Sequence, residues 1–441
     1  MERREFFKIS GAAALAAAFT PRLSSAQTGE NSGQMLMREN PRNGDRISAL
    51  GFGCMRWPMV DGVIDQEAVN EMVDYAIEHG INYFDTSPAY LRGQSEKAAG
   101  IALSRHPREK YFIATKLSNF GDASPAASKK MFFDSLDQLH TDYFDYYLLH
   151  SIGRGGKDAF NKRYVDNGMI AFLREQKAAG RIRNLGFSFH GAKHEFDYFM
   201  ELYDAGEMVW DFVQIEMNYV DWTHADGVRN VNADYLYAEL DKREIPIVIM
   251  EPLLGGRLAN VPEGIARQMK AREPQMSVAS WAFRFCGSYP RVLCILSGMT
   301  NMDPLKENVQ TFSNFRPLTG EELEFLEQMA TQMMEYPLVN CTDCKYCMPC
   351  PWGIDIPGTF QHYNKAITEG TYAQSTTQKN YAKLKKAYLV SYDRAVATVR
   401  QADHCIGCGE CLSHCPQSIP IPEQLNRIAK YIENLRQDKL P

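Results

Sequence analysis

The cysteines of this chain are crowded into its C-terminal part. Eleven cysteines occur in 441 residues, and eight of them lie between Cys341 and Cys415. The first four stand in the run CTDCKYCMPCP, and the other four stand in CIGCGECLSHCP. Disulfides, zinc sites and iron–sulfur clusters all use dense cysteines. Each of these cross-links a short segment, so the cysteine runs constrain the local fold strongly.

The spacing within the runs favours iron–sulfur clusters. The second run reads C-x2-C-x2-C-x3-C-P, the spacing of bacterial ferredoxins with [4Fe–4S] clusters, in which the fourth cysteine serves the other cluster. The first run has a last gap that is one residue shorter. Structural zinc prefers two well-separated CxxC pairs, and cysteines three residues apart rarely suit a disulfide. We predict two clusters, with the ligand sets Cys341, Cys344, Cys347, Cys415 and Cys405, Cys408, Cys411, Cys350.

The first 26 residues have the pattern of an export signal. MERREFFKISGAAALAAAF has a basic start and an apolar run from Ile9 to Phe19, which is too short to span a bilayer. Small residues before position 27 predict cleavage after Ala26, and Arg3-Arg4 resembles the twin-arginine signal. That route carries folded proteins with their cofactors in place, which suits a chain with clusters. We expect a signal peptide at 1–26, a linker at 27–34, and a periplasmic or extracytoplasmic protein without a membrane span after cleavage.

Residues 35–337 alternate between short strand patterns and amphipathic stretches. Eight such strands with intervening helices over about 300 residues predict a (β/α)8 barrel, an α/β fold. A doubly wound sheet is the alternative, but it requires a G-x-G-x-x-G turn after its first strand, and none is present. The expected strands are ISALGFGCM, NYFDTS, YFIATKL, YFDYYLLH, IRNLGFSFH, FVQIEMNY, PIVIMEPL and RVLCILSG.

Ionisable residues stand where three neighbouring strands end, the position of active sites in such barrels. They are Asp85, Tyr90, Lys116 and His150, and the segments NYFDTSPAY, GQSEKAAGIAL, ATK and LLH resemble those of the aldo-keto reductases. The resemblance implies that Tyr90 is the general acid for a carbonyl oxygen and that Lys116 lowers its pKa. Asp85 would orient Lys116, and His150 would polarise the substrate oxygen.

The same resemblance implies a nicotinamide cofactor, NADH or NADPH. Phe189 and Met250 depart from the family pattern at this site, and no Arg or Lys from Ser297 to Leu305 could clamp a 2′-phosphate. A strong preference for NADPH is therefore not expected, and both NADH and the absence of a nicotinamide stay open. The residues that correspond to the family's cofactor contacts are Ser188, Gln214, Pro252, Leu253, Gly255, Glu307 and Asn308.

Residues 338–441 are expected to form a small, mainly helical ferredoxin-like domain that packs against the barrel and depends on its clusters for order. The chain resembles the bacterial aldo-keto reductases fused to such a tail. With a net charge of −6 and no basic patch, nucleic acid is not an expected partner.

The expected function is an exported oxidoreductase that reduces a small carbonyl or oxidises an alcohol, with two clusters relaying electrons to or from a redox partner protein. The alternative is an electron-transfer or docking subunit with a catalytically altered barrel. Clusters move one electron at a time and hydride transfer moves two, and no flavin motif bridges these steps. The sequence leaves the substrate open.

Overall fold

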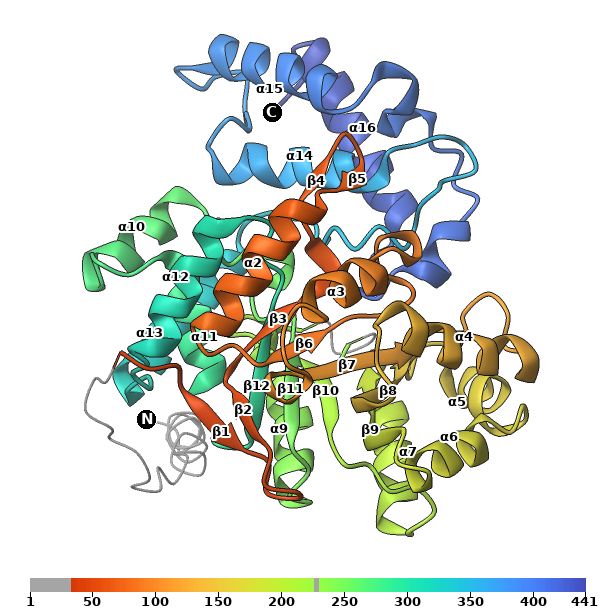
Figure 1. Cartoon of the computed structure of the whole chain (residues 1–441). Helices are drawn as coiled ribbons and strands as arrows, with labels where there is room; N and C mark the ends of the chain where they lie inside the picture. Colours follow the sequence, from red (N-terminus) through yellow and green to blue (C-terminus); the bar gives the residue numbers. More distant parts are fainter. Residues whose placement is uncertain (1–32, 226–229) are drawn as a thin grey trace, which may run out of the picture.

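The computed structural model of the chain describes residues 33–225 and 230–441. The predicted signal peptide lies outside these ranges. Eight parallel strands close into a barrel, as predicted, and they follow one another around it in chain order (Figure 1). The strands are β3 (Leu50–Gly53), β6 (Tyr83–Asp85), β7 (Phe112–Leu117), β8 (Phe144–Ile152), β9 (Ile182–Phe189), β10 (Val213–Glu216), β11 (Ile247–Met250) and β12 (Val292–Ser297).

The barrel strands are buried on both faces. All nine residues of β8 are buried, because their side chains alternate between the barrel interior and the layer of helices. The interior is filled by a separate apolar cluster that includes Tyr83, Tyr146, Phe212 and Leu293. An antiparallel hairpin of β1 (Met37–Glu39) and β2 (Arg46–Ser48) precedes the barrel and contributes the buried Ile47 to that cluster. The interior is therefore a packed core, and chemistry is confined to the rim.

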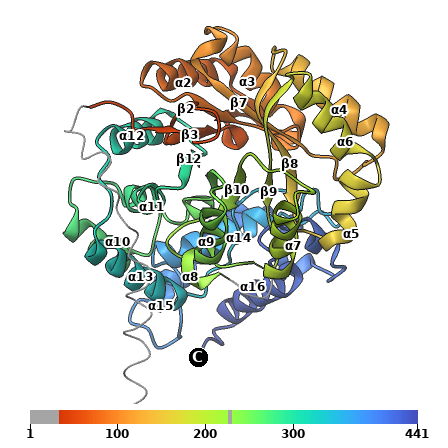
Figure 2. The same ribbon diagram turned by 90° about the horizontal axis from the view of Figure 1, so that it is seen from below.

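A ring of helices surrounds the barrel (Figure 2). Aspartate and serine side chains cap several of their N-termini; Asp65, for example, accepts a hydrogen bond from the amide of Ala68 at the start of α2. The helices are α2 (Gln66–Glu78), α3 (Ser95–Leu103), α4 (Pro125–Gln138), α5 (Gly156–Phe160), α6 (Met169–Ala178), α7 (Lys193–Asp204), α8 (Asp221–His224), α9 (Ala233–Lys242), α10 (Glu263–Arg272), α11 (Val278–Gly287), α12 (Met302–Ser313) and α13 (Gly320–Met334). A second small hairpin, β4 (Met59–Val60) with β5 (Val63–Ile64), precedes α2.

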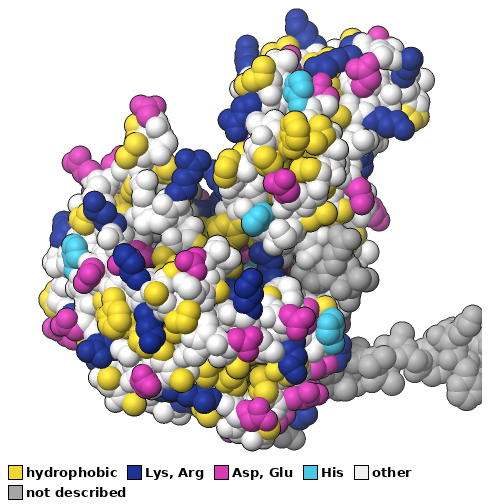
Figure 3. Space-filling model, turned by 90° about the vertical axis from the view of Figure 1, so that its right-hand side faces the viewer, with side chains coloured by type: hydrophobic (Ala, Val, Ile, Leu, Met, Phe, Trp, Pro, Cys, Tyr) yellow, Lys and Arg dark blue, Asp and Glu magenta, His cyan; other side chains and the backbone are white. Residues whose placement is uncertain are grey.

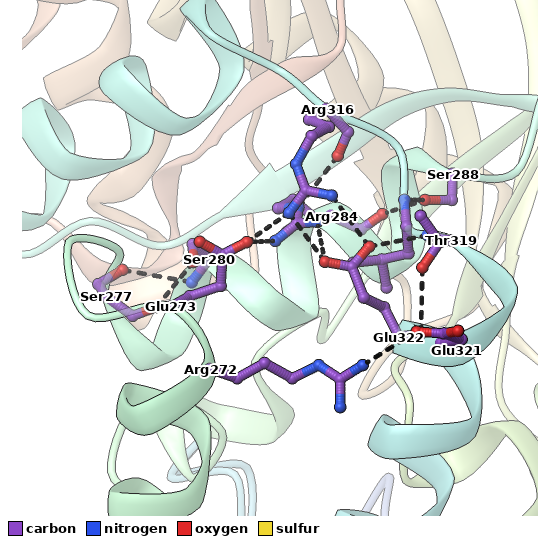
Figure 4. Close-up of polar contacts among 11 residues, drawn as sticks. Arg272, Glu273, Ser277, Ser280, Arg284, Ser288, Arg316, Thr319, Glu321 and Glu322 are labelled. Atoms are coloured by element: carbon purple, nitrogen blue, oxygen red, sulfur yellow. Dashed lines mark hydrogen bonds and ion pairs between the residues drawn. The ribbon is translucent and has the colours of Figure 1, made fainter.

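A buried ion network ties α11 to α13 (Figure 4). The Arg284 guanidinium donates to Glu322 at 2.9 Å and to Glu273 at 3.3 Å, and Arg316 donates to Glu322 at 2.8 Å. The Glu322 side chain is 8% exposed and also accepts the amide of Thr319. Burial alone would raise the pKa of Glu322, but hydrogen bonds from Arg316, Thr319 and Arg284 lower the pKa to about 2.

We expect Glu322→Ala to lower the free energy of unfolding by about 3–5 kcal/mol, because it leaves the buried Arg284 short of its main partner. Thermal unfolding of the protein with its clusters intact, followed by circular dichroism, measures the change. Glu321→Ala is the matched control, since its side chain is 89% exposed. The stabilisation by Glu322 is complete above the carboxyl pKa of the unfolded chain, about 4.3, and is lost as the pH falls towards 2. An equal effect of both variants would contradict this account.

The C-terminal tail forms a second, smaller body on the barrel (Figures 1 and 3). Its helices are α14 (Ile356–Thr368), α15 (Tyr381–Ala395) and α16 (Ile421–Arg436). They enclose an apolar core of their own, with Phe360, Tyr388 and Ile428 fully buried. The tail therefore has an apolar core separate from that of the barrel. Four tyrosines, including Tyr363 and Tyr431, supply the large buried rings that a short chain needs.

Candidate active site

The four predicted catalytic side chains meet at one end of the barrel. Asp85 ends β6, Lys116 lies in β7, His150 lies in β8, and Tyr90 begins a short turn after β6. Asp85, Tyr90 and His150 line a cavity of about 310 Å³. The buried Lys116 Nζ lies 2.5 Å from Asp85 Oδ1 and 4.8 Å from the centre of the Tyr90 ring. Parallel strands bring these groups together because their carboxyl ends share one rim.

The electrostatics at Tyr90 differ from the sequence expectation. Burial, and then the charge of Asp85, raise the pKa of Tyr90 well above its usual value. The Lys116 ammonium is paired with the carboxylate of Asp85 and also donates to the Thr86 carbonyl at 2.8 Å, and the net shift of the Tyr90 pKa is upward. Tyr90 is therefore a protonated phenol throughout the physiological pH range. It can donate a proton to an oxygen that gains negative charge, but it is a poor base.

His150 is held as a neutral ring. Burial, followed by the charges of Lys116 and Arg163, lowers the pKa of His150 well below its usual value. Its Nδ1 lies 2.5 Å from the hydroxyl of Ser118 and 3.3 Å from that of Ser87. The neutral ring can accept these hydroxyl protons at Nδ1 and keep its own proton on Nε2. In that tautomer His150 can donate a hydrogen bond to a substrate oxygen in the cavity.

The residues expected to bind a nicotinamide cofactor are only partly brought together. Ser188, Gln214, Pro252, Leu253 and Gly255 line the cavity. The Ser188 hydroxyl accepts the amide of Ser151 at 2.8 Å, and the Gln214 amide donates to Asp85 at 3.2 Å.

The two expected adenine contacts do not line the cavity. Asn308 is buried and donates to the Ser297 hydroxyl at 3.1 Å. Glu307 is exposed on α12. Neither side chain is therefore placed with the other five expected cofactor contacts.

The donor set at the cavity does not suit a pyrophosphate. The amide of Gly255, one of the expected cofactor contacts, donates instead to the Glu251 carboxylate at 2.6 Å. Burial and the nearby charge of Glu216 raise the pKa of Glu251 to about 7. Glu216 and Glu251 both line the cavity, and Arg56 is the one arginine or lysine among its described lining residues. The Gly255 amide is thus already occupied by Glu251, and two carboxyl groups stand where a doubly negative ligand needs donors, so these residues do not fit a dinucleotide.

The tail supplies one wall of the same cavity, which the sequence did not predict. Thr342, Cys344, Tyr346, Pro416 and Gln417 all line it. The Tyr346 ring lies 6.5 Å from the His150 ring, and the Gln417 amide donates to the Glu216 carboxylate at 2.6 Å. The signal that could have revealed this wall was the position of Tyr346 between two predicted cluster ligands.

The cysteines gather into the two predicted groups of four. Burial, with contributions from Cys415 and Cys341, raises the pKa of Cys344 to about 12, and the same thiols act on Cys347. This first group has one member, Cys344, in the cavity wall.

The second group lies at the tail surface. Burial raises the pKa of Cys411 to about 11, with contributions from Cys405, Cys408 and Cys350. Cys408 is exposed. Among the described residues no three thiol, imidazole or carboxylate groups converge on one metal ion. A cube in which each cysteine binds a separate iron requires no such convergence.

Comparisons with known proteins match both parts of the chain. Residues 49–331 match the model of the aldo/keto reductase family, and residues 340–419 match that of the 4Fe-4S dicluster domain. The uncharacterized oxidoreductase YqkF of Bacillus subtilis is 28% identical over 316 residues, which cover 65% of this chain and 94% of that protein. The NADH-specific methylglyoxal reductase of Escherichia coli is 27% identical over 303 residues, covering 60% and 89%.

A solved structure shares the barrel fold. The holo form of the aldo-keto reductase AKR11C1 from Bacillus halodurans superposes with a TM-score of 0.54 and 24% identity. The match covers 67% of this chain and 96% of that one. In the described ranges, 33–225 and 230–441, none of the helices has the length and apolar character required to cross a membrane.

Proposed function

Because this chain is an oxidoreductase that belongs to the aldo/keto reductase family, we propose that it reduces a small carbonyl compound, or oxidises the corresponding alcohol, at Tyr90, Asp85, Lys116 and His150. Two [4Fe–4S] clusters in the tail relay the electrons. The observation that carries this proposal is the shared cavity: Tyr90, His150 and the cluster ligand Cys344 line the same space.

Reduction of a carbonyl adds two electrons and two protons. The C=O π bond breaks, Tyr90 supplies the proton that forms the O–H bond, and a proton taken from solvent water, together with the electron pair, forms the C–H bond. His150 donates to the same oxygen and stabilises the negative charge that develops on it. The Lys116 ammonium, paired with Asp85, lies over the Tyr90 ring, 4.8 Å from its centre. The two electrons come from an external redox protein, and clusters held by the two cysteine sets would supply one-electron transfer.

The ligand sets that we propose are Cys341, Cys344, Cys347 and Cys415 for the inner cluster, and Cys405, Cys408, Cys411 and Cys350 for the outer one. Bound clusters supply one-electron transfer. The outer set includes the exposed Cys408, so the redox partner is expected to dock there. The inner set includes Cys344 at the cavity, so this set faces the substrate.

We also propose export by the twin-arginine route to the periplasm or another extracytoplasmic location. The support is the sequence of residues 1–26 and the presence of cysteine sets that must be loaded before export. Cell fractionation tests this: a cleaved protein outside the cytoplasm is expected, and an uncleaved cytoplasmic protein would contradict it.

A second candidate function is an electron-transfer or docking subunit whose barrel no longer reduces carbonyls. The acidic Glu251 and the departures at Phe189 and Met250 favour it. The deciding experiment begins with anaerobic purification and an inventory of iron, sulfide and bound nucleotide. The protein is then assayed with a panel of small aldehydes and ketones, including methylglyoxal, and reduced methyl viologen. Carbonyl-dependent oxidation of the viologen supports an enzyme, and its absence across the panel supports the subunit.

The pH dependence of the rate should differ between carbonyl reduction and alcohol oxidation. Since the pKa of Tyr90 is raised by burial and by Asp85, reduction should show no loss from Tyr90 ionisation up to pH ~9. Alcohol oxidation requires the phenolate as base, so its rate should rise about tenfold per pH unit over the same range. Initial rates from pH ~6 to ~9 measure this. A plateau of the oxidation rate near neutral pH would contradict the raised pKa.

A further inference from the structure

The tail lies in close contact with the barrel loop that follows β11. Gly255 has φ +67° and lies so close to the tail that a Cβ there would meet Thr342 Cα at 2.3 Å. The next residue but one, Arg257, donates to Asn340 of the tail at 2.7 Å. This loop carries Pro252, Leu253 and Gly255, three of the expected cofactor contacts. Here Asn340 and Thr342, at the start of the first cysteine run, contact this loop.

Arg56 closes a second part of the rim. Its side chain lies along Gly298 after β12, where a Cβ would meet Arg56 Cδ at 2.9 Å. The same side chain donates to the Thr342 carbonyl and lies 3.7 Å from the carboxylate of Asp343. Arg56 thus joins the loops after β3 and β12 to the tail.

The two glutamates at this end of the barrel accept hydrogen bonds from groups of the chain itself. Glu251 holds the Gly255 amide, and Glu216 holds Gln417 of the tail. Glu251 is also kept in the left-handed region, with φ +55°, a conformation that costs energy for a non-glycine residue. The loop is thus organised around contacts within the chain, and its amide is not left free for a phosphate.

We propose that the cluster-binding tail takes the place of the nicotinamide dinucleotide, so that this chain works without NADH or NADPH. The inner cysteine set, through Cys344, then lies where the substrate exchanges electrons. This inference rests on the proposed function and deepens it. The two electrons and two protons of carbonyl reduction balance as above, with an external one-electron carrier as the only reductant. The cavity between Tyr90 and Tyr346 holds the substrate alone.

The test uses the full-length protein, purified anaerobically with its clusters. NADH and NADPH are titrated separately, and binding is followed by nicotinamide fluorescence and by calorimetry. Because KM values of enzymes run from about 1 µM to about 1 mM, we expect no saturable binding up to about 1 mM of either nucleotide. We also expect that neither bleaches the visible absorbance of the clusters, whereas reduced methyl viologen does. Saturable binding with a dissociation constant below about 0.1 mM would overturn the proposal.

Failure of this inference differs from failure of the proposed function. Tight NADH binding with NADH-driven carbonyl reduction overturns the inference and keeps the enzyme. No nucleotide binding and no viologen-driven carbonyl reduction supports the inference and removes the enzyme. Arg56→Ala provides a further measurement. It removes the side chain that lies along Gly298 and contacts Thr342, while the Glu251–Gly255 contact remains. If the wild-type protein and Arg56→Ala both bind NADH tightly, the tail does not occupy the dinucleotide position.

Discussion

Replacement of Tyr90 by phenylalanine should lower carbonyl reduction by about 10²- to 10⁴-fold, the range for loss of a positioned general acid. Tyr90 lines the cavity as a protonated phenol, and the centre of its ring lies 4.8 Å from the Lys116 ammonium. Phenylalanine keeps the ring and its contact with the ion pair but has no proton to give. Turnover with reduced methyl viologen and the best carbonyl of the panel measures the effect.

The matched control for Tyr90→Phe is Tyr75→Phe. Tyr75 lies on α2, where its ring stacks on His79 at 3.8 Å, and it does not line the cavity. Both variants should contain wild-type amounts of iron, and the control should keep wild-type turnover. Full activity of Tyr90→Phe at wild-type iron content would show that another group provides the proton.

Replacement of Cys415 by alanine should remove the inner cluster and abolish viologen-driven carbonyl reduction. Cys415 stands at the end of the second cysteine run, but its thiol lies with Cys341, Cys344 and Cys347 of the first. The iron content should fall from about eight to about four atoms per chain, as expected when one of two [4Fe–4S] clusters is lost. Iron analysis and electron paramagnetic resonance of the reduced protein measure this.

Cys350→Ala is the comparison for Cys415→Ala, because Cys350 ends the first run and lies with the second group. It should remove the outer cluster and leave the signal that Cys415→Ala abolishes. Cys286→Ala, a buried barrel cysteine, should keep both clusters. If Cys415→Ala and Cys350→Ala lost the same signal, the crossed ligand assignment would be wrong.

The barrel could be predicted because each strand is buried on both faces and each is followed by an amphipathic stretch. The ends of strands such as β6 and β8 then placed Asp85 and His150 on a common rim without further information. The crossed cysteine sets are predicted by the spacing rule alone. These features depend on periodicity and local spacing, which a single sequence contains.

Other features depend on contacts between distant segments, which spacing does not encode. The raised pKa of Tyr90 comes from its burial and from the charge of Asp85. The sequence does not reveal this burial, nor the pairing of Lys116 with Asp85. The contact of Thr342 with Gly255 joins residues almost ninety positions apart. Tyr346 reaches the cavity only because the tail docks over the rim. The sequence also did not predict the apolar core of the tail, because the tyrosines that contribute to it are scattered along the tail.

The most direct test of the account is a single-turnover experiment on the anaerobic protein with both clusters reduced and excess reductant removed. Mixing with the carbonyl substrate, without any nicotinamide, should restore the oxidised cluster absorbance and yield one alcohol for each pair of electrons lost. Tyr90→Phe, reduced in the same way, should remain reduced on this timescale. Clusters that stay reduced in the wild-type protein, while added NADH alone drives formation of the alcohol, would contradict the account.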